Sequence, residues 1–93
     1  MAEAEVGDDG FGDDPTVNRL QATFAEVVGK EAALFVPSGT MANQIALRLL
    51  GRPGTVVLVG RRQHLVVREV AAAGVNGTAQ LVTLDDDDGT IDP

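Results

Sequence analysis

The strongest constraint on the fold is a change of hydrophobic pattern within one short stretch of chain. The apolar run from Ala32 to Val36 predicts a short strand, and the residues from about Met41 to Leu50 predict a helix. Between them stands the tetrapeptide Pro37-Ser-Gly-Thr40, which supplies both a breaker and a helix cap. A strand that leads directly into a helix is typical of an α/β sheet.

The remaining segments continue this alternation. Asp14-Pro15 supplies a cap and a first helical residue for a helix to about Val28, which Gly29 ends. Further along, the pattern predicts a strand buried on both faces, then a helix, then a second short strand; these are Thr55–Val59, His64–Ala73 and Gln80–Leu84. The predicted fold class is therefore α/β, with a parallel or mixed sheet and flanking helices.

The turn before the second helix has the chemistry of an anion site. The first amides of a helix lack partners within it, and the helix dipole places partial positive charge there. Gly39 lets the backbone approach an anion closely, and the hydroxyls of Ser38 and Thr40 can donate to phosphate oxygens. A plain N-cap, in which Ser38 or Thr40 accepts from the following turn, explains the same residues equally well.

Composition excludes several classes of function. The 93 residues carry 14 acidic and 7 basic side chains, a net charge of -7, so the chain lacks the basic stripe that nucleic acid binding needs. Without cysteine it can form no disulfide or thiolate metal site. No apolar run is long enough for a membrane span, and no targeting pattern begins the sequence. We therefore expect a cytoplasmic protein.

Two long motifs and one histidine together point to a family. They are VGDDGFGDDPTVNRL at residues 6–20, GKEAALFVPSGTMANQ at residues 29–44, and His64 followed by Glu69 and a run of small residues. In order and spacing they resemble the N-terminal part of the low-specificity L-threonine aldolases. These are pyridoxal 5'-phosphate enzymes of the aspartate aminotransferase fold type (fold type I), and the resemblance covers nearly the whole chain.

The resemblance implies a function for the parent protein. The expected reaction is reversible cleavage of a β-hydroxy-α-amino acid, chiefly L-threonine or L-allo-threonine, to glycine and acetaldehyde. The expected assembly is a homotetramer, a dimer of dimers. Residues 1–93 would form an N-terminal fragment of the cofactor-binding large domain, incomplete at both ends.

The resemblance also assigns roles to individual residues. Ser38, Gly39 and Thr40 would bind the cofactor phosphate, and His64 would stack on the pyridine ring and take part in proton transfer at the substrate hydroxyl. A neutral imidazole suits that work, although an isolated histidine after a strand is more often a surface residue. Glu69 could orient His64 or contact a neighbouring subunit, or it could be a solvated helix carboxylate.

Two other features are not expected to carry chemistry. Lys30 is the only lysine, but it follows a helix end, where a cation meets the helix dipole and points to solvent. The family's Schiff-base lysine would fall beyond Pro93, so we expect this chain to be inactive alone. The aspartate-rich loop at residues 8–14 lacks calcium-loop spacing, and we expect no metal there and only loop and cap roles, the latter for Asp14.

Three alternatives remain open at this point. Another fold type I lyase or transaminase would share the phosphate turn and the stacking residue. A noncatalytic interaction remnant would bind a partner through its exposed helix faces. An α/β sheet that lacks its other strands also leaves unpaired edges and bare apolar faces, so the isolated chain could fail to fold.

Overall fold

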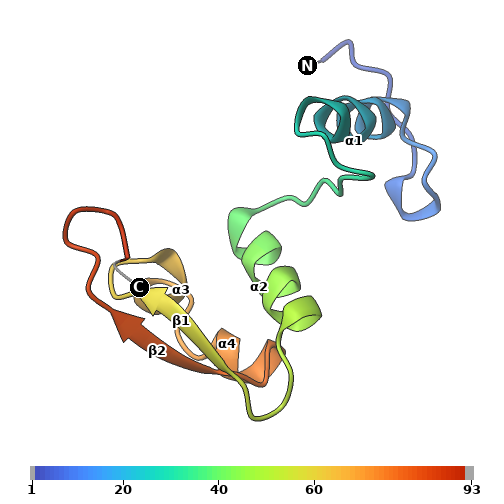
Figure 1. Ribbon diagram of the computed structural model, residues 1–93. Helices are drawn as coiled ribbons and strands as arrows, with labels where there is room; N and C mark the ends of the chain where they lie inside the picture. The colour runs from blue at the N-terminus through green and yellow to red at the C-terminus, as the bar shows by residue number, and fades with distance from the viewer. Residues whose placement is uncertain (1, 92–93) are drawn as a thin grey trace. The chain divides into compact units, whose positions relative to one another are not determined.

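The computed structural model describes residues 2–91. Met1, Asp92 and Pro93, the ends of the expected fragment, lie outside the described residues. The elements in chain order are η1 (Asp9–Phe11), α1 (Pro15–Val27), α2 (Gly39–Leu50), β1 (Val56–Gly60), α3 (His64–Val67), α4 (Ala72–Asn76) and β2 (Gln80–Leu84) (Figure 1). They fall into two compact units, the first ending at Val36 and the second beginning at Pro37.

The first unit is built around α1, whose two ends are those the sequence predicts. At its start the carboxylate of Asp14 accepts from the amides of Thr16 and Val17, at 3.0 and 2.9 Å. Beyond its end, Gly29 takes a left-handed φ of +64°. The amides of Gly29 and Lys30 then donate back to the carbonyls of Glu26 and Ala25, which satisfies two terminal carbonyls of the helix.

Asp14 also makes the first unit sensitive to acid. Hydrogen bonds from the amides of Val17, Gly7 and Thr16 lower the pKa of Asp14 below its ordinary value of 3.8. A carboxyl group with a lowered folded pKa stabilises the fold above its unfolded value. That stabilisation is lost as the pH falls through the folded value.

We therefore expect Asp14→Ala to reduce the helicity of α1 at pH 7, since the cap and its three acceptor contacts disappear. The difference from the wild type should shrink as the pH falls below 3.8 and vanish only below the lowered folded pKa, where the wild-type carboxyl is itself protonated. Circular dichroism across a pH series measures both effects. Asp13→Ala, at an exposed neighbouring residue, is the matched control, and an equal loss in that variant would contradict the cap assignment.

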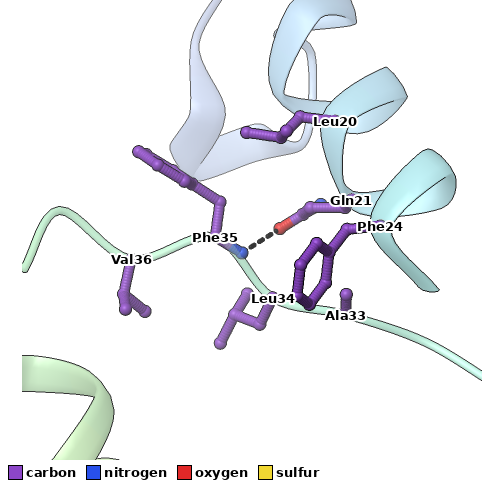
Figure 2. Close-up of a pocket in the computed structure, with 7 residues that line it drawn as sticks. All are labelled: Leu20, Gln21, Phe24, Ala33, Leu34, Phe35 and Val36. Atoms are coloured by element: carbon purple, nitrogen blue, oxygen red, sulfur yellow. Dashed lines mark hydrogen bonds between the residues drawn. The ribbon is translucent and has the colours of Figure 1, made fainter. Parts of the chain in front are cut away.

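The predicted strand at Ala32–Val36 is absent. The segment has no regular secondary structure and pairs with no strand among residues 2–91. One of its amides, that of Phe35, donates instead to the side-chain oxygen of Gln21 at 2.8 Å. An apolar groove of about 260 Å³ lies between this segment and α1. The residues that line it, drawn in Figure 2, are Leu20, Gln21, Phe24, Ala33, Leu34, Phe35 and Val36.

The second unit is a β-α-β arrangement. β1 and β2 run parallel and side by side, in a register that extends from Val56 opposite Gln80 to Gly60 opposite Leu84 (Figure 1). The connection between them contains α3, which packs against β1, and α4, which contacts β2 and α2. A parallel pair joined through helices confirms the predicted α/β class. The bounds of β2 are those predicted, and β1 is shifted by one residue.

Two sequence expectations for this unit are wrong. β1 is not buried on both faces, because Val56 and Leu58 are exposed while Val59 is buried. The single helix predicted over His64–Ala73 is instead split into α3 and α4. Val70, between them, has a φ of +51°, a left-handed conformation that a β-branched residue rarely adopts and that interrupts the helix.

Helix α2 begins two residues earlier than predicted and ends, as predicted, at Gly51. At helical spacing the sequence puts the apolar residues Ala42, Ile45 and Leu49 on one side of this helix, but the buried residue is Leu47, and Leu49 is 79% exposed. Leu47 packs against the chain at Gly77, next to α4. The small core of this unit comprises Leu47, Val59, Ala73 and Ala79. Within residues 2–91, no helix combines the length and apolar character that crossing a membrane requires.

Candidate functional site

The N-terminus of α2 is both capped and open. The hydroxyl oxygen of Ser38 accepts from the amide of Met41 at 3.2 Å, so the plain N-cap interpretation is confirmed. Ser38, Gly39 and Thr40 are nevertheless exposed, and a Cβ added at Gly39 would meet no atom within 4 Å. The cap uses the Met41 amide, and the amides of Gly39 and Thr40 before it have no acceptor within the helix. The cap is therefore compatible with an anion site.

His64 is held by an acidic side chain. It is the first residue of α3, four residues after the end of β1, and its side chain is 55% exposed. Its Nδ1 lies 2.7 Å from Oε1 of Glu69, five residues further along. One ring nitrogen is thus fixed inside the protein, while the ring remains accessible to a ligand.

Glu69 is the centre of a buried polar cluster. Glu69 is 6% exposed. Its Oε1, the oxygen beside His64, also accepts from Nδ2 of Asn43 at 2.8 Å. The other oxygen, Oε2, accepts from Nε2 of Gln44, whose own Oε1 accepts from Nδ2 of Asn76 at 3.0 Å. We call Asn43, Gln44, Glu69 and His64 the Glu69 cluster. It joins the second turn of α2 to the start of α3.

The cluster keeps Glu69 ionised. Hydrogen bonds from Asn43 first, and then from His64 and Gln44, lower the pKa of Glu69 below its ordinary value of 4.5, although burial acts in the opposite direction. An ionised carboxylate accepts hydrogen bonds and donates none. The possibility that Glu69 is a solvated helix carboxylate is therefore wrong, and the possibility that it orients His64 is supported by direct contact.

Sequence reasoning missed Asn43 and Gln44 as members of the site. The available signal was a pair of adjacent amide side chains inside a helix whose other residues from Met41 to Leu50 are apolar except Arg48. Both are half-buried, and buried amides need partners. Which carboxylate they meet depends on the packing of α2 beside α4, which periodicity along one helix does not specify.

A second buried carboxylate, Asp86, stabilises the sheet. Asp86 is 2% exposed. Both of its carboxylate oxygens lie 3.3 Å from the backbone amide nitrogen of Arg62. The side-chain Nε of Arg62 lies 3.4 Å from Oδ1 of Asp86. This contact joins the chain after β2 to the chain after β1. Arg61 pairs with Asp85 at 3.1 Å on the exposed side. The two adjacent arginines therefore contact the aspartate run of their own chain.

Lys30 and the apolar groove lie apart from these residues in the chain. Lys30 is exposed and follows α1 in the first unit, where its amide completes the helix end. The groove of Figure 2 is also formed within the first unit and is lined by none of Ser38, Gly39, Thr40 or His64. Its lining is apolar apart from Gln21, so it offers no charged group for anion binding and no titratable side chain for proton transfer.

Comparison with known proteins gives a consistent result. The family model for beta-eliminating lyases matches residues 1–93. The chain is 47% identical over 85 residues, 91% of its length, to the low specificity L-threonine aldolase of Escherichia coli strain K12, of which it covers 26%. It is 43% identical over 94 residues to low-specificity L-threonine aldolase 1 of Arabidopsis thaliana, covering 99% of this chain and 26% of that one.

A fungal relative gives a similar match. The low specificity L-threonine aldolase of Saccharomyces cerevisiae is 41% identical over 81 residues, which is 86% of this chain and 21% of the yeast protein. The chain thus spans about a quarter of the length of the curated relatives it matches.

Proposed function

Because the chain belongs to the beta-eliminating lyase family, we propose that the protein of which it is a part cleaves β-hydroxy-α-amino acids. The proposed substrates are L-threonine and L-allo-threonine, and the products are glycine and acetaldehyde. The relatives named low-specificity L-threonine aldolases support this reaction. The structural observation that carries the proposal is that one helix, α2, both begins at an exposed turn with space beside Gly39 and contacts the carboxylate that holds His64.

The cofactor we propose is pyridoxal 5'-phosphate, and the residues at the turn fit its phosphate. Ser38, Gly39 and Thr40 are exposed at the start of a 12-residue helix, where dipole and amides favour an anion. Space at Gly39 lets a phosphate oxygen approach the backbone. When bound, the cofactor supplies an electron sink for cleavage of the bond between Cα and Cβ.

His64 has the properties needed for the proton step. Its exposed imidazole can cover an aromatic ring on one side of a bound ligand. A neutral imidazole can accept the proton of the substrate's β-hydroxyl, which must leave before the carbon–carbon bond breaks. We propose His64 as this base.

The remaining features of the enzyme belong to the proposal as well. Residues 1–93 form an N-terminal part of the large domain of a fold type I enzyme, and the β-α-β arrangement of the second unit agrees with this. The Schiff-base lysine lies outside this chain, Lys30 does not replace it, and the chain is therefore inactive alone. A homotetrameric assembly and a cytoplasmic location, expected from the resemblance and the composition, remain predictions.

The proposal can be tested with a hybrid enzyme, in which this chain replaces the matching 85-residue segment of the Escherichia coli aldolase. We expect the hybrid to release acetaldehyde from L-threonine, and the 93-residue chain with added cofactor to release none. His64→Ala should lower kcat of the hybrid by about 10²- to 10⁴-fold, the usual range for losing a general base. A coupled aldehyde assay measures each rate.

Lys30→Ala is the matched control, because Lys30 is exposed in the first unit and outside the proposed site. It should leave the hybrid fully active. Loss of activity in this variant, or turnover by the isolated chain that Lys30→Ala abolishes, would refute our assignment of the lysine. A folded hybrid that binds the cofactor but does not cleave threonine would refute the proposed reaction.

A further inference from the structure

The carboxylate of Glu69 has more hydrogen-bond partners than an ion pair with His64 alone would give it. Three side chains converge on one carboxylate that is 6% exposed. Two of the three, Asn43 and Gln44, come from the second turn of α2, whose first residues form the proposed phosphate turn. The third is the imidazole of His64. Glu69 therefore couples the orientation of His64 to the helix that begins at Gly39.

We propose that Glu69 is a positioning residue that fixes His64 as the Nδ1–H tautomer, which leaves Nε2 as the ring's only proton acceptor. The reason is geometric. An ionised carboxylate can only accept, so the contact of 2.7 Å between Oε1 and Nδ1 requires the hydrogen to be on Nδ1. In a neutral ring, the other nitrogen then carries a free lone pair.

The amide donors strengthen this constraint. Asn43 donates to Oε1, the oxygen that also faces His64, and Gln44 donates to Oε2. Because both oxygens receive N–H groups from α2, Glu69 has little freedom to turn away from the imidazole. The Oε1 of Gln44 is itself engaged by Asn76, which fixes the direction of the Gln44 amide. The carboxylate is thereby held by two donors from α2 in addition to His64.

The catalytic meaning of the tautomer depends on the proposed function, since Nε2 is then the atom that takes the substrate's hydroxyl proton. The tautomer itself does not depend on it. His64 is the only histidine in the chain, so its ring nitrogen signals need no assignment. The tautomer can be measured on the full 93-residue chain without cofactor or substrate.

The experiment is long-range ¹H–¹⁵N NMR of the labelled chain, at a pH where the nitrogen shifts show a neutral ring. We expect Nδ1 to carry the proton in the wild type and its Hδ1 to show a nuclear Overhauser contact to the Hγ protons of Glu69. In Glu69→Ala the ratio of Nδ1–H to Nε2–H should fall by about tenfold or more, because a charge-assisted hydrogen bond is lost. Glu26→Gln, at an exposed residue of α1, should not change the ratio.

A wild-type ring protonated mainly on Nε2 would overturn the inference. The same holds for a Glu69→Ala variant that keeps the wild-type amide spectrum and the wild-type tautomer ratio. If Glu69→Ala loses its folded spectrum, the wild-type tautomer and the contact from Hδ1 to Glu69 decide the question alone. Failure of the proposed function would look different: the hybrid would be inactive although the ring of His64 carries its proton on Nδ1.

Discussion

Replacing Gly60 by alanine is expected to unfold the second unit. Gly60 is the last residue of β1, and a Cβ built on it would lie 2.7 Å from Cγ of Asp86 and closer still to Oδ2. Asp86 cannot move aside easily, because it is 2% exposed and accepts from the backbone and side chain of Arg62. Overpacking at such a position costs about 3 kcal/mol, most of the stability that a unit of this size has.

Urea unfolding of the chain, followed by amide signals of β1 and β2, measures this loss. Gly74→Ala is the matched control, since Gly74 lies in α4 and a Cβ there would meet nothing within 4 Å. That change should be neutral or stabilise by up to about 1 kcal/mol, the usual gain of alanine over glycine in a helix. Equal stability of the Gly60 and Gly74 variants would show that Asp86 does not occupy the space beside β1.

A negative charge at Gly39, in the turn we propose for the phosphate, should weaken cofactor binding while it stabilises the fold. Gly39 is the first residue of α2, and a side chain there meets no atom within 4 Å. In Gly39→Asp, the new carboxylate should stabilise the helix by about 0.3–1 kcal/mol through the dipole. The same charge should weaken cofactor binding by the hybrid enzyme on the order of a hundredfold, through repulsion of the phosphate. Equilibrium dialysis and thermal unfolding give the two values.

Gly39→Ala is the control for this prediction. It adds a side chain in the same open space without charge, so cofactor affinity should change by no more than a few fold. Affinities of the alanine and aspartate variants that both equal that of the unsubstituted hybrid would place the phosphate elsewhere. If both changes abolish binding, the glycine is required for close approach of the backbone, and charge is not the deciding factor.

The sequence predicted those elements whose signals are local. Helix α1 begins at Pro15 after the Asp14 cap and is followed by Gly29 in a left-handed conformation, because these residue types determine their own backbone geometry. Strand β2 was predicted with its observed bounds from a short apolar run. The segment at Ala32–Val36 has an equally apolar pattern but forms no strand, because a strand needs a neighbour and the described residues provide none.

In the candidate site, too, the sequence predicted the local feature but not the contacts between distant residues. A capped helix start at Ser38 follows from residue types at fixed spacing, and the structure contains it. For His64, the sequence offered Glu69 as one possible partner but did not select it, and it did not indicate Asn43 or Gln44. Glu69 lies beyond α3, in the break that precedes the left-handed Val70, so no helical periodicity relates it to His64. Its binding to Asn43 and Gln44 joins residues 26 and 25 positions apart.

The amino-acid sequence by itself determined the family motifs, the α/β class and the capped helix start at Ser38, since caps, breakers and apolar periods act over a few residues. Only the tertiary structure decided that Leu47 rather than Leu49 is buried. The same holds for the contact of Asp86 with Arg62 after the two strands and for the contact of Glu69 with His64. These choices depend on which surfaces meet when α2, α3 and α4 pack with the two strands. Contacts between residues distant in the chain are properties of that packing.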